Sequence, residues 1–107
     1  MTRYASGRRQ EYLVKKLLES AGAYLVTRSA GSKGAADLVA FFDHATYAVQ
    51  VKRAKPTGAE HLKVQEASAN TACKWVMVWS NAGVIRQWVY QRGKASKIPV
   101  PGLGNGL

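Results

Sequence analysis

Residues 34–42 read Gly-Ala-Ala-Asp-Leu-Val-Ala-Phe-Phe, and residues 47–52 read Tyr-Ala-Val-Gln-Val-Lys. Both segments consist mainly of aliphatic and aromatic residues, and the short polar connection Asp-His-Ala-Thr separates them. This pattern predicts a β-hairpin whose strands belong to the core of the protein. Each strand nevertheless carries polar residues, which are Asp37 in the first and Gln50 and Lys52 in the second.

These three polar residues are predicted to share one face at one end of the hairpin. Pairing Phe42 with Tyr47 across the turn places residue 37 opposite residue 52, and alternation then directs the three side chains the same way. A bulge, or a one-residue shift of one strand, removes this arrangement. A simpler interpretation stays open, in which Asp37 caps a turn and Gln50 and Lys52 form the wet side of a strand.

The rest of the chain predicts an α/β domain with a mixed sheet. Apolar residues at helical spacing predict a helix over residues 6–21, with Ser6 as its N-cap and Gly22 as its stop. The other predicted elements are strands at residues 24–28, 74–79 and 84–90 and a helix at residues 59–71. The order helix, three strands, helix, two strands is typical of an α/β fold. We expect one domain over residues 1–93 and a flexible basic tail over residues 94–107.

Charge is the most informative property of the composition. Sixteen Lys and Arg residues against six Asp and Glu give a formal net charge of +10 over 107 residues. Such an excess favours a nucleic acid as partner over an anionic membrane surface, since no basic amphipathic helix with a bulky apolar face stands out. The single cysteine, Cys73, and the lack of an apolar signal or membrane-spanning segment predict an intracellular, cytoplasmic protein.

The polar residues of the hairpin have the chemistry of a cation site. A carboxylate and an amide carbonyl both offer oxygen to a hard cation such as Mg²⁺. A neighbouring ammonium assists a metal-bound water or neutralises charge on a phosphate. Glu11, on the rim of the apolar face of the first helix, supplies a second carboxylate. Glu11 also fits the alternative of an ordinary acid favoured by the helix dipole in a first turn.

Three motifs in this order resemble a known group of enzymes. They are Gly-Arg-Arg-Gln-Glu at residues 7–11, Arg-Ser-Ala-Gly-Ser-Lys-Gly-Ala-Ala-Asp at residues 28–37, and Val-Gln-Val-Lys at residues 49–52. The set resembles the PD-(D/E)XK nuclease superfamily, and within it the archaeal-type Holliday junction resolvases, including small phage-borne versions. The resemblance covers roughly the first half of the chain. It implies a single restriction-endonuclease-like domain with a central mixed β-sheet flanked by helices.

The resemblance also implies roles for individual residues. Glu11, Asp37, Gln50 and the backbone carbonyl of Val51 match the metal-binding positions, with Mg²⁺ as the metal and Mn²⁺ as a substitute. Lys52 matches the catalytic lysine, and Ser32 matches a loop serine that approaches the scissile phosphate. Contacts to DNA phosphates are implied for a set of basic residues, namely Arg8, Arg9, Arg28, Lys33, Arg53 and Lys55.

Two positions depart from the pattern of the superfamily. Ala36 stands where the proline that names it is expected, and Gln50 replaces an acidic residue. A Gln-x-Lys motif resembles another branch, the virus-type replication-repair nucleases. Because glutamine keeps an oxygen ligand and loses a charge, we expect metal binding to be weaker than at a site with three carboxylates, and the Val51 carbonyl to matter more.

The function implied is cleavage of four-way DNA junctions by paired symmetric nicks, carried out by a homodimer. Two alternatives are a flap-cutting or nicking nuclease and a DNA-binding module of the same fold without activity. A nucleotide cofactor is not expected, because the segment at residues 30–37 lacks the Gly-Lys-Ser/Thr ending of a phosphate-binding loop. We interpret Trp75, Trp79 and Trp88 as core residues or dimer contacts rather than base-stacking platforms. The sequence indicates no partner for His44 or His61, so we interpret both as surface residues.

Overall fold

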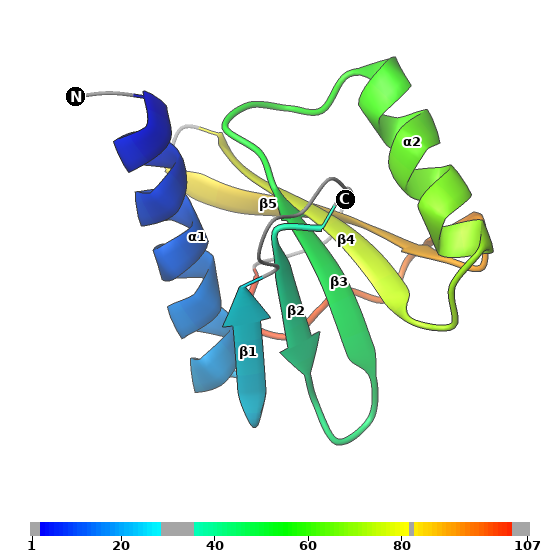
Figure 1. The fold of residues 1–107 in the computed structure, drawn as a ribbon, viewed down its shortest axis with the longest axis horizontal. Helices are drawn as coiled ribbons and strands as arrows, with labels where there is room; N and C mark the ends of the chain where they lie inside the picture. Colours follow the sequence, from blue (N-terminus) through cyan, green and yellow to red (C-terminus); the bar gives the residue numbers. More distant parts are fainter. Residues whose placement is uncertain (1–2, 29–35, 82, 104–107) are drawn as a thin grey trace.

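A computed structural model describes residues 3–28, 36–81 and 83–103, with side chains described from residue 9 onward except at residue 81. The chain begins with a helix that is followed by three strands, a second helix and three more strands (Figure 1). The elements are α1 (Arg3–Ser20), β1 (Leu25–Arg28), β2 (Leu38–Phe41), β3 (Thr46–Val51), α2 (Gly58–Ala69), β4 (Lys74–Asn81), β5 (Val84–Gln91) and β6 (Lys94–Ser96).

The strands form one six-stranded mixed sheet in the order in which they occur along the chain. All neighbouring strands are antiparallel except β3 and β4, which run parallel. A parallel pair needs a crossover connection, and α2 provides it. The protein is therefore an α/β domain, as the order of the sequence elements predicts.

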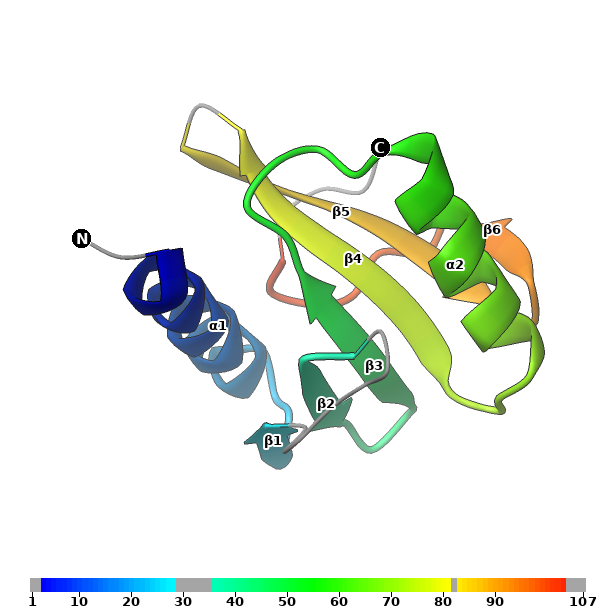
Figure 2. The same cartoon turned by 45° about the horizontal axis from the view of Figure 1, so that its top comes forward.

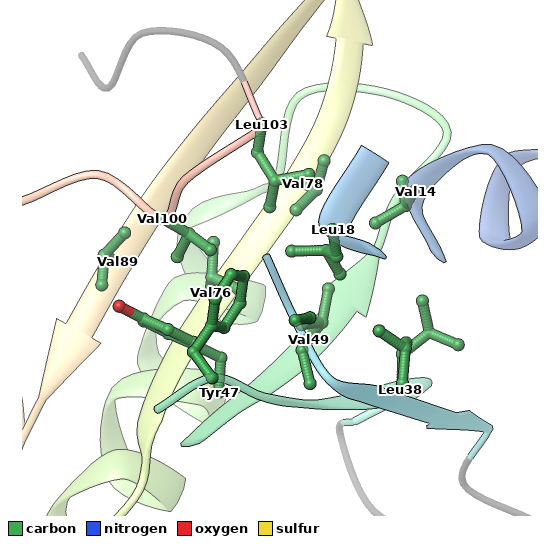
Figure 3. Packing of buried hydrophobic residues seen from close by; sticks show 14 residues of the cluster. Val14, Leu18, Leu38, Tyr47, Val49, Val76, Val78, Val89, Val100 and Leu103 are labelled. Atoms are coloured by element: carbon green, nitrogen blue, oxygen red, sulfur yellow. The ribbon is translucent and has the colours of Figure 1, made fainter. Parts of the chain in front are cut away.

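The two helices cover opposite faces of the sheet (Figures 1 and 2). Helix α1 packs on β1, β2 and β3, and α2 packs on β4, β5 and β6. The larger core lies under α1, where Val14 and Leu18 point toward Val49 and Val78 of the sheet (Figure 3). The smaller core, under α2, contains Val64, Met77 and Tyr90 among other residues. Alternation along β4 explains both cores, since Val76 and Val78 face α1 whereas Trp75 and Met77 face α2.

The pairing of β2 with β3 differs from the predicted register. Phe41, rather than Phe42, begins the pairing by lying opposite Thr46. Phe42 closes the turn by donating its N–H to the carbonyl of Ala45 at 2.9 Å, and its ring packs edge-on against Tyr47. Burying that ring in the core under α1 shifts the register by two residues, so residue 37 adjoins residue 50 rather than residue 52.

The C-terminal segment is part of the domain, so the predicted boundary at residue 93 is wrong. Residues 94–96 form the edge strand β6, and Val100 and Leu103 are fully buried beside α1 and the sheet (Figure 3). Gly102 makes this docking possible, because its φ is +87° and a side chain there would lie 2.6 Å from the carbonyl oxygen of Leu17. Residues 104–107 of the predicted tail lie outside the described residues.

The helices and strands otherwise differ from the predicted ranges by a few residues at their ends. Helix α1 begins at Arg3, before the predicted N-cap Ser6, and ends before Gly22, whose φ is +114°. Helix α2 begins after Thr57, whose hydroxyl accepts a hydrogen bond from the N–H of Glu60. Among the described residues, neither helix has the length and apolarity that crossing a membrane requires.

Candidate functional site

Asp37 lies at the point where the regular pairing of β2 with β3 ends. Its N–H donates to the carbonyl of Val49 at 2.8 Å, although Val49 already pairs with Leu38. Its carboxylate oxygen Oδ2 accepts the N–H of Val51 at 2.8 Å. The carboxylate thus takes the place of a backbone group in the ladder and lies at the edge of β3. The ladder is irregular at this residue, so strict alternation, on which the shared face of Asp37, Gln50 and Lys52 was predicted, does not extend to Asp37.

Gln50 and Val51 offer further oxygen atoms next to Asp37. The side-chain oxygen Oε1 of Gln50 is buried and has no hydrogen-bond partner in the described part of the chain. A buried acceptor without a donor costs free energy, and such an atom in a folded protein calls for an explanation such as a bound ion. The carbonyl of Val51 points to the same side of β3 as its N–H, which is the side of Asp37. The residues that carry these three oxygen atoms are therefore neighbours at the end of β3.

Lys52 follows β3 immediately, and both its backbone and its side chain are held by contacts. Its N–H donates to the carbonyl of Val78 at 2.7 Å, and its ammonium forms an ion pair with Glu60 of α2. Glu60 is itself held by the helix start, because its Oε1 accepts the N–H of Thr57 at 2.9 Å. The ion pair and this hydrogen bond lower the pKa of Glu60 below its usual range. The lysine is thereby tied to the first turn of α2.

Glu11 approaches the same end of the sheet from α1. Its Oε1 lies 3.2 Å from Nε of Arg28, and the two residues border a pocket of about 190 Å³ that Leu38 also lines. Arg28 pairs with Leu38 in the ladder, which places Arg28 next to Asp37. The guanidinium is therefore paired with Glu11, and its charge also lowers the pKa of Asp37. In this arrangement Glu11 is paired with a cation.

The charges around Asp37 have opposing effects on its protonation. Burial raises the pKa of Asp37 above its usual range, while the hydrogen bond from Val51 and the positive charges of Lys52 and Arg28 lower the pKa by less. A divalent cation at the carboxylate would oppose the effect of burial. Among the described residues, no three His, Cys, Asp or Glu side chains come together to hold a metal. A cation at this site therefore depends on the amide of Gln50 and on backbone oxygen.

Some of the predicted DNA-contacting residues can be placed in the structure. Arg9 and Arg53 are exposed and border a groove of about 600 Å³ together with Lys16, Tyr12 and Leu13. Lys55 is also exposed, and its ammonium lies 5.7 Å from the centre of the Trp88 ring. Three other predicted positions cannot be placed, because Ser32, Lys33 and the side chain of Arg8 lie outside the described residues.

Two residues of the site were missed by the sequence interpretation. Glu60 was detectable, since Thr57 followed three residues later by a glutamate is the pattern of a capping box. Gln10 gave no such signal. Its Oε1 is buried without a partner among the described residues, and it lines a pocket of about 120 Å³ with Lys52 and Trp79.

The tryptophans and histidines were interpreted from the sequence as well. Trp75 and Trp79 are buried within the domain, at 8% and 2% exposure, which confirms that these two are core residues. His61 is bonded to the hydroxyl of Tyr90, and His44 Nε2 lies 3.0 Å from the hydroxyl of Tyr47. His44 is an exposed surface residue as predicted, whereas His61 is half-buried, and the sequence indicated a partner for neither.

Comparison with known proteins finds no significant match: no family model matches the chain, and neither a curated protein nor a solved structure does.

Proposed function

We propose that the protein is a metal-dependent endonuclease with a restriction-endonuclease-like fold that hydrolyses phosphodiester bonds of branched DNA. The observation that carries the proposal is the hydrogen bond between Asp37 and the N–H of Val51 at the end of β3, next to Gln50, whose buried Oε1 has no partner among the described residues. Lys52, which follows this set directly, supplies a fixed cation. An oxygen-lined site beside a positioned ammonium suits the chemistry of phosphate hydrolysis.

The residues present fit Mg²⁺ or Mn²⁺ as a weakly held cofactor. Asp37, Gln50 and Val51 would hold the ion, and Glu11 would join them if it exchanged Arg28 for the metal. The bound ion supplies an activated water and a polarised phosphate. Lys52 neutralises charge that develops on the phosphate, and Glu60 keeps its ammonium in place. Arg28 is available to bind the phosphate once Glu11 releases it.

The substrate class follows from the charge distribution. A net charge of +10 on a chain of 107 residues favours a polyanion. Arg9 and Arg53 border one groove from two different segments, and Arg53 and Lys55 follow Lys52 closely in the chain. These residues recognise backbone phosphates rather than base sequence. A homodimer would present two copies of the site to the two strands of a four-way junction.

A second candidate is a DNA-binding module without activity. It is favoured by the ion pair that occupies Lys52 and by the absence, among the described residues, of a cluster of three acidic or other metal-binding side chains. In that protein the same basic surface would bind branched DNA and leave it intact.

Cleavage assays separate these candidates. The protein is incubated with end-labelled four-way junction, flap and plain duplex DNA in the presence of Mg²⁺, Mn²⁺ or a chelator, with Asp37→Asn as the inactive control. Paired symmetric nicks in the junction support a resolvase, and cuts in the flap or the duplex indicate a nuclease of other specificity. Binding with no cleavage in either metal overturns the enzymatic proposal and favours the binding module.

A further inference from the structure

An aromatic pocket lies beside α2, on the face of the sheet that also carries Gln50. The pocket measures about 260 Å³, and His61, Trp88, Tyr90 and Lys97 are among the residues that line it. The centre of the His61 ring lies 3.9 Å from that of Trp88, and His61 also forms a hydrogen bond with the hydroxyl of Tyr90. The pocket is therefore walled by rings that hold one another in place.

Trp88 differs from the other two tryptophans in being only half-buried. Trp79 lies next to it in the interior, with ring centres 4.7 Å apart, and supports one side of its ring. The ammonium of Lys55 lies 5.7 Å from the ring centre, and Lys97 lines the pocket close by. An accessible aromatic surface bordered by cations is the combination that binds a base together with its phosphate.

The ladder fixes the distance between this pocket and the candidate site. Gln50 lies opposite Met77, and Met77 lies opposite Trp88, so the three residues form one row across β3, β4 and β5. Neighbouring strands are about 4.8 Å apart, which places the backbone of Trp88 roughly 10 Å from that of Gln50. A single strand spans this distance within a few nucleotides, since a fully stacked strand advances about 3.4 Å per nucleotide.

We propose that the aromatic pocket binds an unpaired base of a DNA strand whose nearby phosphate lies at the candidate site. This inference rests on the proposed function and adds the feature of the substrate that the protein selects. A base inside a continuous duplex is stacked on both sides and does not reach the pocket without paying for unstacking. Strands at a branch point carry bases whose stacking is already interrupted. The pocket therefore favours junctions and flaps over plain duplex.

The test compares two single-stranded probes with the same phosphates. One is an oligothymidylate of about 16 nucleotides, the upper end of the usual site size, and the other is its abasic counterpart. Affinities are measured by fluorescence anisotropy in the presence of a chelator, so that no cleavage is required. We expect the wild type to bind the probe with bases about tenfold more tightly, since stacking of one base has that order of effect. Trp88→Leu reduces this preference to near one, and Trp88→Phe keeps most of it.

Matched variants distinguish loss of base binding in the pocket from a general loss of DNA affinity. Tyr24→Leu removes an exposed aromatic ring just before β1, away from the pocket, and leaves the preference unchanged. Lys55→Met weakens binding of both probes. If Trp88→Leu fails to fold, His61→Leu tests the other wall of the pocket. A wild type that binds both probes equally, or a folded Trp88→Leu or His61→Leu variant with the full preference, overturns the inference. Absence of cleavage activity leaves this preference intact, so failure of the proposed function remains a separate result.

Discussion

The ammonium of Lys52 is bonded to the carboxylate of Glu60, and the same carboxylate accepts the backbone N–H of Thr57. One side chain thus closes the N-terminus of α2 and positions the lysine that follows β3. The link explains why the crossover helix matters to a site formed by β2 and β3. Glu60 would act on the reaction through Lys52, which makes it a positioning residue.

The first prediction concerns this link. Glu60→Gln keeps an acceptor for the N–H of Thr57 and loses the charge, so we expect slower cleavage together with a loss of stability of only about 0.5–1 kcal/mol. Because the pKa of Glu60 is lowered in the folded protein, the stabilisation is complete above about pH 4.3, the usual pKa of a glutamate, and disappears as the pH falls below it. Rates and urea unfolding at several pH values check both effects.

Two further variants control this experiment. Thr57→Ala removes the hydroxyl cap, which costs about 1 kcal/mol of stability, and leaves the ion pair of Lys52 in place. It should cleave at a rate close to that of the wild type. Glu60→Gln should add nothing to the defect of Lys52→Ala; a further loss of rate in the double variant would show that Glu60 does not act through the lysine.

The second prediction concerns Asp37. Asp37→Asn keeps an oxygen that accepts the N–H of Val51 and removes the negative charge. We expect cleavage to fall by more than about a hundredfold through loss of the metal ligand, with DNA affinity unchanged or raised. Gel-shift and cleavage assays on the same junction measure the two properties. Cleavage at the wild-type rate would remove Asp37 from the site.

Asp37 also predicts how stability depends on pH. Burial raises its pKa in the folded state, so the native protein binds this proton more tightly than the unfolded chain does. The wild type therefore loses stability relative to Asp37→Asn as the pH rises from about 3.9, the usual value for an aspartate, through the raised pKa. Urea unfolding in a chelator from pH 3.5 to 7 measures the difference. A difference that stays constant over this range would contradict the effect of burial.

The third prediction concerns Gln50. Gln50→Glu supplies a third charged ligand, so we expect Mn²⁺ to bind on the order of tenfold more tightly. The same variant should lose stability in a chelator, because a second carboxylate then lies beside Asp37. Isothermal titration with Mn²⁺ and thermal unfolding with and without metal measure these effects. Gln91→Glu, which adds the same charge at an exposed position, is the matched control, and equal affinity in both variants would exclude Gln50 as a ligand.

The fourth prediction concerns the docking of the C-terminal segment. Gly102→Ala places a methyl group 2.6 Å from the carbonyl oxygen of Leu17 and 2.7 Å from Cβ of Ala21, at a φ of +87°. We expect a loss of about 2–4 kcal/mol from the clash and the backbone strain together. Gly83→Ala has a similar φ of +79° and no atom within 4 Å, so it should lose only about 1–2 kcal/mol. Chemical denaturation compares the stability of the two variants. Equal losses of stability would show that residues 94–103 are not anchored to α1 at Gly102.

Much of the fold follows from the sequence because its signals are local. Three examples are the valines of β4, the Gly22 stop and the polar turn between β2 and β3. Each signal depends on residues close to it in the sequence, and these elements lie where the patterns predict them. The last segment was misjudged for the opposite reason. Its glycines and prolines resemble those of a flexible tail, whereas Val100 and Leu103 are buried by residues of α1 and the sheet that are far away in the chain.

The candidate site likewise has some features that the sequence determines and others that depend on the tertiary structure. The sequence by itself determined which chemical groups are present, an acid before β2 and an amide and an amine at the end of β3, since residue types and strand alternation are written in it. Only the tertiary structure decided how they meet. Packing of the Phe42 ring set the register, the irregular ladder turned Asp37 toward Val51, and the two helices brought Glu11 to Arg28 and Glu60 to Lys52. These contacts depend on long-range packing, which no local pattern encodes.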